Sequence, residues 1–322
     1  MSLDRNADPE SMTLDMLPVD VLLKILEPLD VKNKIKLREV SKTMLYAVDK
    51  FKMEFDRISI ACLQNSVRIY IRADGYFWRK DYSEESDGGN YVEIALQVMK
   101  LLLKPSKIRA KQFKIYSKNS DNLKPIVNLL GSISKTENSK FHVENAKIVI
   151  DQRDLALKLL SVMRPRILET MDIGFCNSEF LDMNEIKYME QFKQAKTVDL
   201  SGLGFIQSAN LELFSNFESF RVEVESMEPD DVKRLRDNLT KPNTFKKCLI
   251  ISWNAFENMA GMGKNSNKRL RFFIRNDCVA VEKGDHIELE AMRQEYGDDF
   301  YDDPDFETEW GKDNIWDPFD DW

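Results

Sequence analysis

A repeating unit in residues 91–275 constrains the fold more than any other feature of this sequence. In each unit an amphipathic, helix-like stretch leads into a short strand in which two apolar residues flank a third residue of any type. The second apolar residue recurs at intervals of 22 to 35 residues. The paired apolar positions are Phe113/Ile115, Ile148/Ile150, Met171/Ile173, Val198/Leu200, Phe220/Val222, Cys248/Ile250 and Phe272/Ile274.

Helices between these strands predict a parallel sheet, because parallel neighbours need a long crossover connection and a helix supplies it. Helix candidates lie at 154–163, 183–192 and 228–239, the last opened by Pro229. The spacing is close to the roughly 20–29 residues of leucine-rich repeats. We therefore predict an α/β fold class, an irregular leucine-rich-repeat-like solenoid with a parallel sheet. A hairpin around Lys283-Gly284-Asp285, with strands at 279–281 and 286–289, is expected to cap the last repeat.

Residues 14–52 predict three short amphipathic helices. The first follows Pro18 at its N1 position and ends near Pro28, the second covers 31–38 after Asp30, and the third follows Ser41 as N-cap. Three helices in under forty residues bury too little surface to be stable alone. Some of their apolar surface is therefore left for the rest of the chain or for a partner.

Residues 56–82 change to a period of two, which predicts a small antiparallel β meander with a hairpin turn at Asp74-Gly75. A loop is expected over 83–90. The predicted domains are a flexible N-terminus (1–13), the three-helix module (14–52), the β meander and loop (53–90), the α/β repeat domain (91–294) and an acidic, aromatic-rich disordered tail (295–322).

Charge is distributed unevenly along the chain. Residues 295–322 carry twelve acids against one base, Lys312, together with eight aromatic residues, while the remainder of the chain is slightly basic. Acidic-aromatic segments are typical of disordered regions that order on binding, and a purely solubilising role is an equal alternative. Residues 104–118 hold six bases and no acid. We interpret them as a solvated connection, with a nucleic-acid patch or a docking position for the tail as alternatives.

No arrangement of residues predicts catalysis, a metal site or a cofactor. The two histidines, His142 and His286, lack neighbouring ligands, and both are expected at the surface or at a strand edge. Gly261 to Lys264 resembles the end of a phosphate loop but lacks its first glycine, since position 258 is Asn. The expectation is a non-catalytic protein.

The expected compartment is intracellular, in the cytoplasm or the nucleus. No run of eighteen apolar residues occurs, and residues 1–10 contain acids and a proline where a secretory signal needs an apolar segment, so neither a membrane partner nor a secretory signal is expected. The four cysteines form no CxxC pair and sit far apart, which favours buried free thiols over disulfides.

Residues 17–48 resemble an F-box. The resemblance rests on Leu17-Pro18 followed by Ile25-Leu26, then Leu29-Asp30, then Leu37 to Lys42 and Leu45, at the spacing that the family uses. The tryptophan that many F-boxes carry near Tyr46 is absent. Residues 91–275 are similar in pattern to the FTH-type domain that follows F-boxes in a family expanded in nematodes.

The F-box resemblance implies binding to a Skp-type adaptor, and through it to a cullin. The residues implied to face the adaptor, or to pack the core of the module, are Leu17, Pro18, Leu22, Ile25, Leu26, Leu29, Leu37, Val40 and Ser41. The alternative is that all nine pack only the module's own core.

The implied function is that of a substrate-recognition subunit of a Skp-cullin-F-box ubiquitin ligase, in which the repeat domain binds an unknown protein target. Residues beside the apolar strand positions face the opposite surface of the sheet and are candidate target contacts. They are Lys114, Asp172, Asp199, Arg221, Glu223 and Arg275, although an ordinary solvated sheet face fits each of them equally well. A non-ligase interaction scaffold is the alternative function, and an RNA-binding repeat protein is a third.

Overall fold

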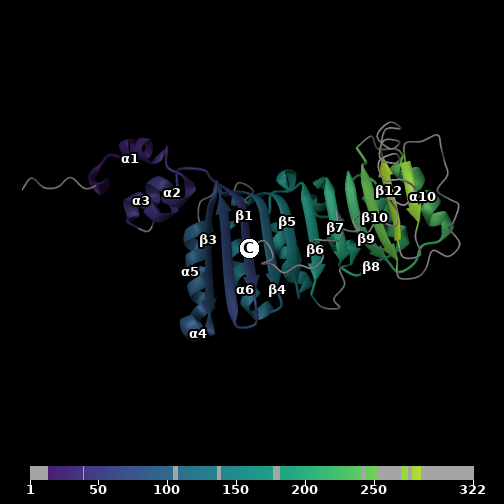
Figure 1. Cartoon of the computed structure of the whole chain (residues 1–322), viewed down its shortest axis with the longest axis horizontal. Helices are drawn as coiled ribbons and strands as arrows, with labels where there is room; N and C mark the ends of the chain where they lie inside the picture. The colour runs from purple at the N-terminus through teal and green to yellow at the C-terminus, as the bar shows by residue number, and fades with distance from the viewer. Residues whose placement is uncertain are drawn as a thin grey trace, which may run out of the picture.

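The computed structural model places a small helical module at one end of a long twisted sheet (Figure 1). The structure describes residues 14–38, 40–103, 108–135, 139–176, 182–240, 244–252, 270–274 and 278–283. The helical module precedes the first strand by only a few residues, so the two parts are connected closely.

The module contains the three predicted helices. They are α1 (Val19–Leu26), α2 (Val31–Arg38) and α3 (Lys42–Val48), preceded by a 3-10 turn, η1 (Leu14–Met16). Side chains cap two of them, since Asp30 accepts from the Asn33 amide at 2.7 Å and Ser41 accepts from the Met44 amide at 3.2 Å. Pro18 is the N-cap of α1 and not its first helical residue, a shift of one position from the prediction.

The predicted antiparallel meander is present as β1 (Met53–Cys62), β2 (Ser66–Ala73) and β3 (Tyr76–Ser83). Asp74 and Gly75 both have positive φ, at 47° and 75°, as a tight two-residue hairpin requires. β1 also pairs in parallel with β4 (Ile108–Ser117). The meander is therefore continuous with the main sheet.

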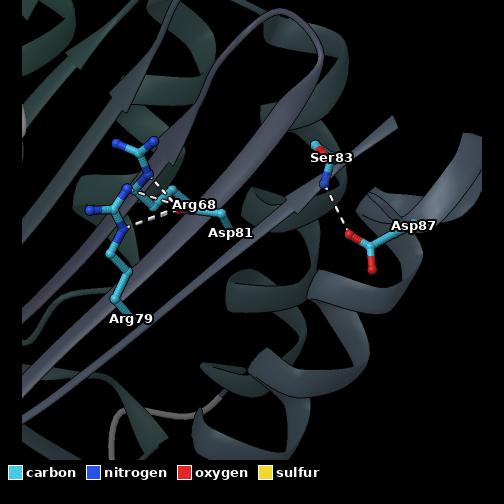
Figure 2. A network of polar contacts seen from close by, with 5 residues as sticks. All are labelled: Arg68, Arg79, Asp81, Ser83 and Asp87. Atoms are coloured by element: carbon cyan, nitrogen blue, oxygen red, sulfur yellow. Dashed lines mark hydrogen bonds and ion pairs between the residues drawn. The ribbon is translucent and has the colours of Figure 1, made fainter. Parts of the chain in front are cut away.

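The segment predicted as a loop over 83–90 forms two short helical turns, α4 (Glu84–Asp87) and η2 (Gly88–Asn90). The Ser83 amide donates to the Asp87 carboxylate at 3.0 Å (Figure 2) and the Ser86 amide to the Ser83 hydroxyl at 3.3 Å. These side-chain contacts stabilise the turns despite the polar, glycine-containing sequence.

The parallel sheet is confirmed for six of the seven predicted strand cores. β1, β4, β5 (His142–Ile150), β6 (Thr170–Phe175), β7 (Thr197–Gly202), β9 (Ser219–Val224) and β10 (Lys247–Ser252) lie side by side in chain order, each parallel to the next. A two-residue strand, β8 (Phe205–Ile206), pairs with β9 beyond the end of β7.

Helical segments link these strands along one face of the sheet, and no helix within the described ranges covers the other face, which we call the open face (Figure 1). They are α5 (Tyr91–Leu103), α6 (Ser120–Ile133), α7 (Arg153–Ser161), η4 (Pro165–Ile167), α8 (Met183–Ile186), α9 (Glu190–Gln194), η5 (Ser208–Phe214) and α10 (Pro229–Leu239). Figure 1 shows α5 and α6 behind the sheet. The helix predicted over 183–192 is divided into α8 and α9, whereas α10 begins at Pro229 as predicted.

The last predicted strand, at Phe272/Ile274, does not extend the parallel series. It lies in β11 (Leu270–Ile274), which is antiparallel to β12 (Cys278–Lys283), and β12 inserts between β11 and β10. Only three residues connect β11 to β12, too few for the crossover that a parallel pair needs. β10 and β11 therefore occupy the two edges of β12. The hairpin that we predicted around residue 284 needs one of these edges for residues 286–289, so that prediction is wrong. Residues 286–289 themselves lie outside the described residues.

The core lies between the helices and the inner face of the sheet. It contains the apolar strand pairs of β4 to β10 and a cluster of phenylalanines whose neighbouring ring centroids lie 5.0 to 6.4 Å apart. The cluster comprises Phe192, Phe214, Phe217, Phe220 and Phe245. At Gly174 and Gly202 the backbones of β6 and β7 approach so closely that a Cβ on Gly202 would lie 2.7 Å from the Gly174 Cα.

Candidate functional site

The surface of the helical module is rich in uncovered apolar side chains. Most of the large hydrophobic residues that are exposed in the described part of the chain belong to this module. They are Leu14, Met16, Val19, Val21, Ile25, Val40 and Tyr46, which we call the apolar module surface. Among the described residues, no later segment of the chain covers these side chains. Exposed apolar surface of this kind is typical of sites that bind another protein.

The nine residues predicted to face an adaptor divide into three groups. Pro18, Ile25 and Val40 are exposed, the last two by 43% and 67%. Leu22 and Leu26 are fully buried in the module's own core. Leu17, Leu29, Leu37 and Ser41 are half-buried, and Ser41 caps α3. The prediction missed Val19, Val21 and Tyr46, whose apolar character was visible in the sequence although the face they occupy was not.

An ion pair fixes α2 against the end of α3. The Arg38 guanidinium lies 2.8 Å from the Asp49 carboxylate, and the arginine side chain is almost fully buried. Burial lowers the pKa of Arg38 while the neighbouring Asp49 charge opposes that shift. A second contact links the module to the sheet, because the Lys32 ammonium lies over the Tyr76 ring at 5.4 Å.

Charged residues line the open face of the sheet in a continuous row. Lys114, Lys147, Asp172, Asp199 and Arg221 are successive register partners across β4, β5, β6, β7 and β9. In-register positions on neighbouring strands are about 4.8 Å apart, so the five side chains lie next to one another. Four of them are half-buried, and Arg221 is buried with 7% exposure.

The row is electrostatically coupled at its centre. The Lys147 ammonium lies 2.8 Å from the Asp172 carboxylate. Burial, and then the neighbouring Asp199 charge, raise the pKa of Asp172 above its ordinary value, and Lys147 opposes that shift. Asp199 accepts hydrogen bonds from the Ser201 amide and hydroxyl at 3.0 and 2.7 Å.

Five of the six predicted target contacts therefore lie on one face of the sheet. Four of them belong to this row, and the fifth, Glu223, lies two residues after Arg221 on the same side of β9. Arg275 lies outside the described residues. The prediction missed the basic residues that β1, β2 and β3 add to this face, namely Arg57, Arg68, Arg72 and Arg79. The alternation of Arg68 and Arg72 with buried Val67, Ile69 and Ile71 was a signal that could have identified the two arginines of β2.

Two arginines of this group share one carboxylate. Figure 2 shows Arg68 and Arg79 converging on Asp81, with nitrogen-oxygen distances of 2.5 and 2.9 Å. Beside them the Tyr70 and Phe77 rings pack with centroids 4.9 Å apart. This end of the open face therefore combines positive charge with accessible aromatic surface.

The comparisons with known proteins agree with this division into a helical module and a sheet. The F-box domain matches residues 14–56, and the FTH domain matches residues 124–273. This chain is an F-box protein with an FTH domain. A relative, F-box A protein 224 of Caenorhabditis elegans, is 24% identical over 267 residues, which cover 77% of this chain and 68% of that protein.

The helical side of the FTH domain contains a cleft of about 430 Å³ between α9, η5 and α10. Lys187, Lys193, Glu212 and Phe192 are among its lining residues. Over the ranges that the structure describes, no three His, Cys, Asp or Glu side chains gather as a metal site would need. No helix in those ranges is long and apolar enough to cross a bilayer.

The structure describes the side chains of three cysteines and of one histidine. Cys62 and Cys248 are buried and free, as predicted, and burial raises the pKa of each thiol. Cys176 is exposed, contrary to the prediction, because it follows β6 at the edge of the sheet, where its thiol donates to the Ser117 carbonyl at 3.4 Å. His142 begins β5, and its pKa is lowered by burial and by the charges of Arg109 and Arg164. His286 and the side chain of Cys278 lie outside the description.

Proposed function

We propose that this F-box protein is the substrate-recognition subunit of a Skp-cullin-F-box ubiquitin ligase. Residues 14–52 bind a Skp-type adaptor, which connects the chain to a cullin, and residues 91–294 bind the protein target. The observation that carries the proposal is the apolar module surface, which gains stability when a partner removes it from water. The proposal places the protein in the cytoplasm, the nucleus or both.

In this mechanism the chain performs no chemistry. Holding the target beside the ubiquitin-charged enzyme raises the effective concentration of its lysines at the reacting centre. We further propose that the FTH domain is a leucine-rich-repeat-like solenoid. The parallel strands adjacent in chain order, with helices along one face, support that architecture.

The proposed target site is the open face of the sheet, around Lys114, Asp172, Asp199, Arg221 and Glu223. These side chains come from four different strands, β4, β6, β7 and β9, so the parallel ladder fixes their spacing. Its mixed charges favour a target with a complementary charge pattern, and charge complementarity gives specificity more readily than affinity.

The proposed docking site is tested by measuring the affinity of a purified Skp-type adaptor for the Ile25→Glu variant and for the natural chain. A carboxylate at this exposed position should leave folding intact but weaken adaptor binding by about 30-fold or more, a loss of ~2 kcal/mol, because it would be buried unpaired in the interface. Leu101→Glu is the matched control, because Leu101 on α5 is exposed by 45% against 43% for Ile25. Equal adaptor affinity for the two variants would refute the proposed site.

A non-ligase interaction scaffold is the second candidate, favoured by the absence of the usual tryptophan near Tyr46. Tyr46 is instead exposed, with the Lys50 ammonium 4.3 Å from its ring centroid. If the scaffold function is correct, partners captured by the FTH domain keep their ubiquitylation and lifetime when the Ile25→Glu variant replaces the natural chain. A ligase receptor predicts that those partners accumulate.

A further inference from the structure

The open face of the sheet is divided into two halves of different charge. On β3, β2, β1, β4 and β5 the open-face cations are Arg79, Arg68, Arg72, Arg57, Lys114 and Lys147, a set that we call the basic half. Asp81 is the one carboxylate among the open-face positions described on these five strands. Farther along, β6, β7 and β9 contribute Asp172, Asp199 and Glu223 together with one cation, Arg221. The basic half therefore attracts an anionic segment more strongly than the rest of the face does.

Aromatic side chains accompany these cations. Tyr70 and Phe77 pack together on the open face, and Phe77 is exposed by 48%. Tyr116 lies on the same face of β4 as Lys114 but is buried, so Tyr70 and Phe77 supply the accessible aromatic surface. An occupant that alternates carboxylates with aromatic rings would match both kinds of side chain.

Residues 295–322 of this chain have that composition. Their twelve acids and eight aromatics are interleaved, as in Phe300-Tyr301-Asp302-Asp303, with Lys312 as the one base. This segment concentrates negative charge in a chain whose remaining residues are slightly basic. Charge complementarity and aromatic content therefore both favour residues 295–322 as the occupant of the basic half.

The covalent connection is long enough for this contact. β12 ends at Lys283, and six strand spacings separate β12 from β4, a distance of about 29 Å. The eleven residues 284–294 span up to roughly 36 Å when extended. β12 also ends at the edge of the sheet where β10 begins, because Glu282 pairs with Lys247. The segment can therefore reach the basic half from the end of β12.

We propose that the acidic, aromatic-rich residues 295–322 dock on the basic half of the open sheet face within the same molecule. The docking requires neither an adaptor nor a target, so it is independent of the ligase function proposed above. A target that used the basic half would have to displace this segment, which would make the segment an internal competitor.

Carbodiimide cross-linking of the unaltered full chain tests the contact. This reagent joins an amine to a carboxylate only when the two touch, and Lys114 and Lys147 supply the amines in the basic half. We expect peptides that join either lysine to residues 295–322 at low salt, and their loss in 1 M NaCl, where charges are screened beyond about 3 Å. Lys158, exposed on α7 on the opposite side of the sheet, is the matched control.

Two results would overturn the proposal. One is that residues 295–322 cross-link to Lys158 as often as to Lys114 and Lys147, or that they cross-link to none of these three lysines. The other is cross-linking that joins differently labelled copies in a mixture of ¹⁵N and ¹⁴N chains, which would mean that the segment binds a second molecule.

Charge reversal supplies a second measurement. In the full chain, Arg72→Glu with Lys114→Glu should speed cleavage within residues 295–322 by a Glu-specific protease at least about fivefold, since two ion contacts become repulsive. Lys100→Glu with Lys158→Glu changes the net charge equally on the helical side of the sheet. Equal cleavage rates in the two double variants would contradict docking on this face.

Discussion

The F-box and the sheet that follows it expose different chemistry to solvent. The F-box presents isoleucine, valine, leucine and methionine side chains across the apolar module surface. The open face of the sheet presents arginine, lysine and aspartate in register across successive strands. A small module cannot cover its own apolar residues, whereas a long sheet covers one face with helices and leaves polar residues on the other. Contacts to the F-box should therefore resist salt, and contacts to the open face should weaken in it.

The comparison also separates residues that maintain each region from residues that are available for binding. Replacing Phe220 at the centre of the phenylalanine cluster should have the largest effect on the sheet. Phe220→Ala is expected to lower the free energy of unfolding by about 3–5 kcal/mol, because it leaves a cavity among Phe214 and Phe245. Urea denaturation measures the loss. Phe77→Ala on the exposed face is the control, and an equal loss there would contradict this division.

The same separation applies within the F-box to Leu22 and Ile25, three residues apart on α1. Leu22→Ala should cost about 2–5 kcal/mol because Leu22 is fully buried. Ile25→Ala should change stability by roughly 0.5 kcal/mol or less, as is usual at exposed positions. Thermal unfolding followed by circular dichroism distinguishes them, and a large loss for Ile25→Ala would mean that the apolar module surface is covered by the chain itself.

A smaller effect is expected where β6 and β7 approach most closely. Gly202→Ala should destabilise the sheet by about 1–3 kcal/mol, because the added methyl meets the Gly174 backbone and neither strand can move without disturbing its ladder. Gly131→Ala on α6 is the control, since a Cβ there meets nothing within 4 Å and alanine favours a helix. Equal denaturation midpoints for the two variants would show that the strands separate easily at this point.

The smallest effect concerns the charged row. The raised pKa of Asp172 means that the native state holds this proton more tightly than the unfolded chain does. Its contribution to stability is therefore present at acidic pH and is lost as pH rises through the raised pKa. Asp199→Asn removes the second largest cause of the shift, so the pKa of Asp172 should fall toward its ordinary value and this loss with pH should shrink.

Carboxyl NMR titration, with urea midpoints recorded across the same pH range, measures both quantities. Asp237→Asn, on the exposed side of α10, is the control. A titration of Asp172 unchanged by Asp199→Asn would mean that burial alone raises its pKa, against the opposing effect of Lys147.

The sequence predicted most of the secondary structure because the local signals were strong. Caps at Asp30 and Ser41 and the Asp74-Gly75 turn determine boundaries through contacts within a few residues. The direction of β11 could not be predicted in this way. The apolar pair Phe272/Ile274 looks the same in a parallel or an antiparallel strand, and the choice depends on which neighbour is available and on the length of the connection.

The candidate sites divide in the same way. Alternation along β4 predicted that Lys114 faces away from the helices, and the register of the sheet then brought it beside Lys147. Ile25 and Leu26 are adjacent and equally apolar, yet one is exposed and the other buried. Which face of a short helix its neighbours cover depends on tertiary packing, and periodicity does not encode it when two faces are apolar.

The connection between the F-box and the sheet has a mechanical consequence. The chain passes from α3 into β1 within four residues, and β1 is held on both sides, by β2 and by β4. A pull on the helices is therefore applied along a strand in the interior of the sheet, where many hydrogen bonds share the load at once. An edge strand could be separated from the sheet one hydrogen bond at a time. Attachment to an interior strand therefore favours transmission of force from the helices to the sheet while the two parts keep their relative orientation.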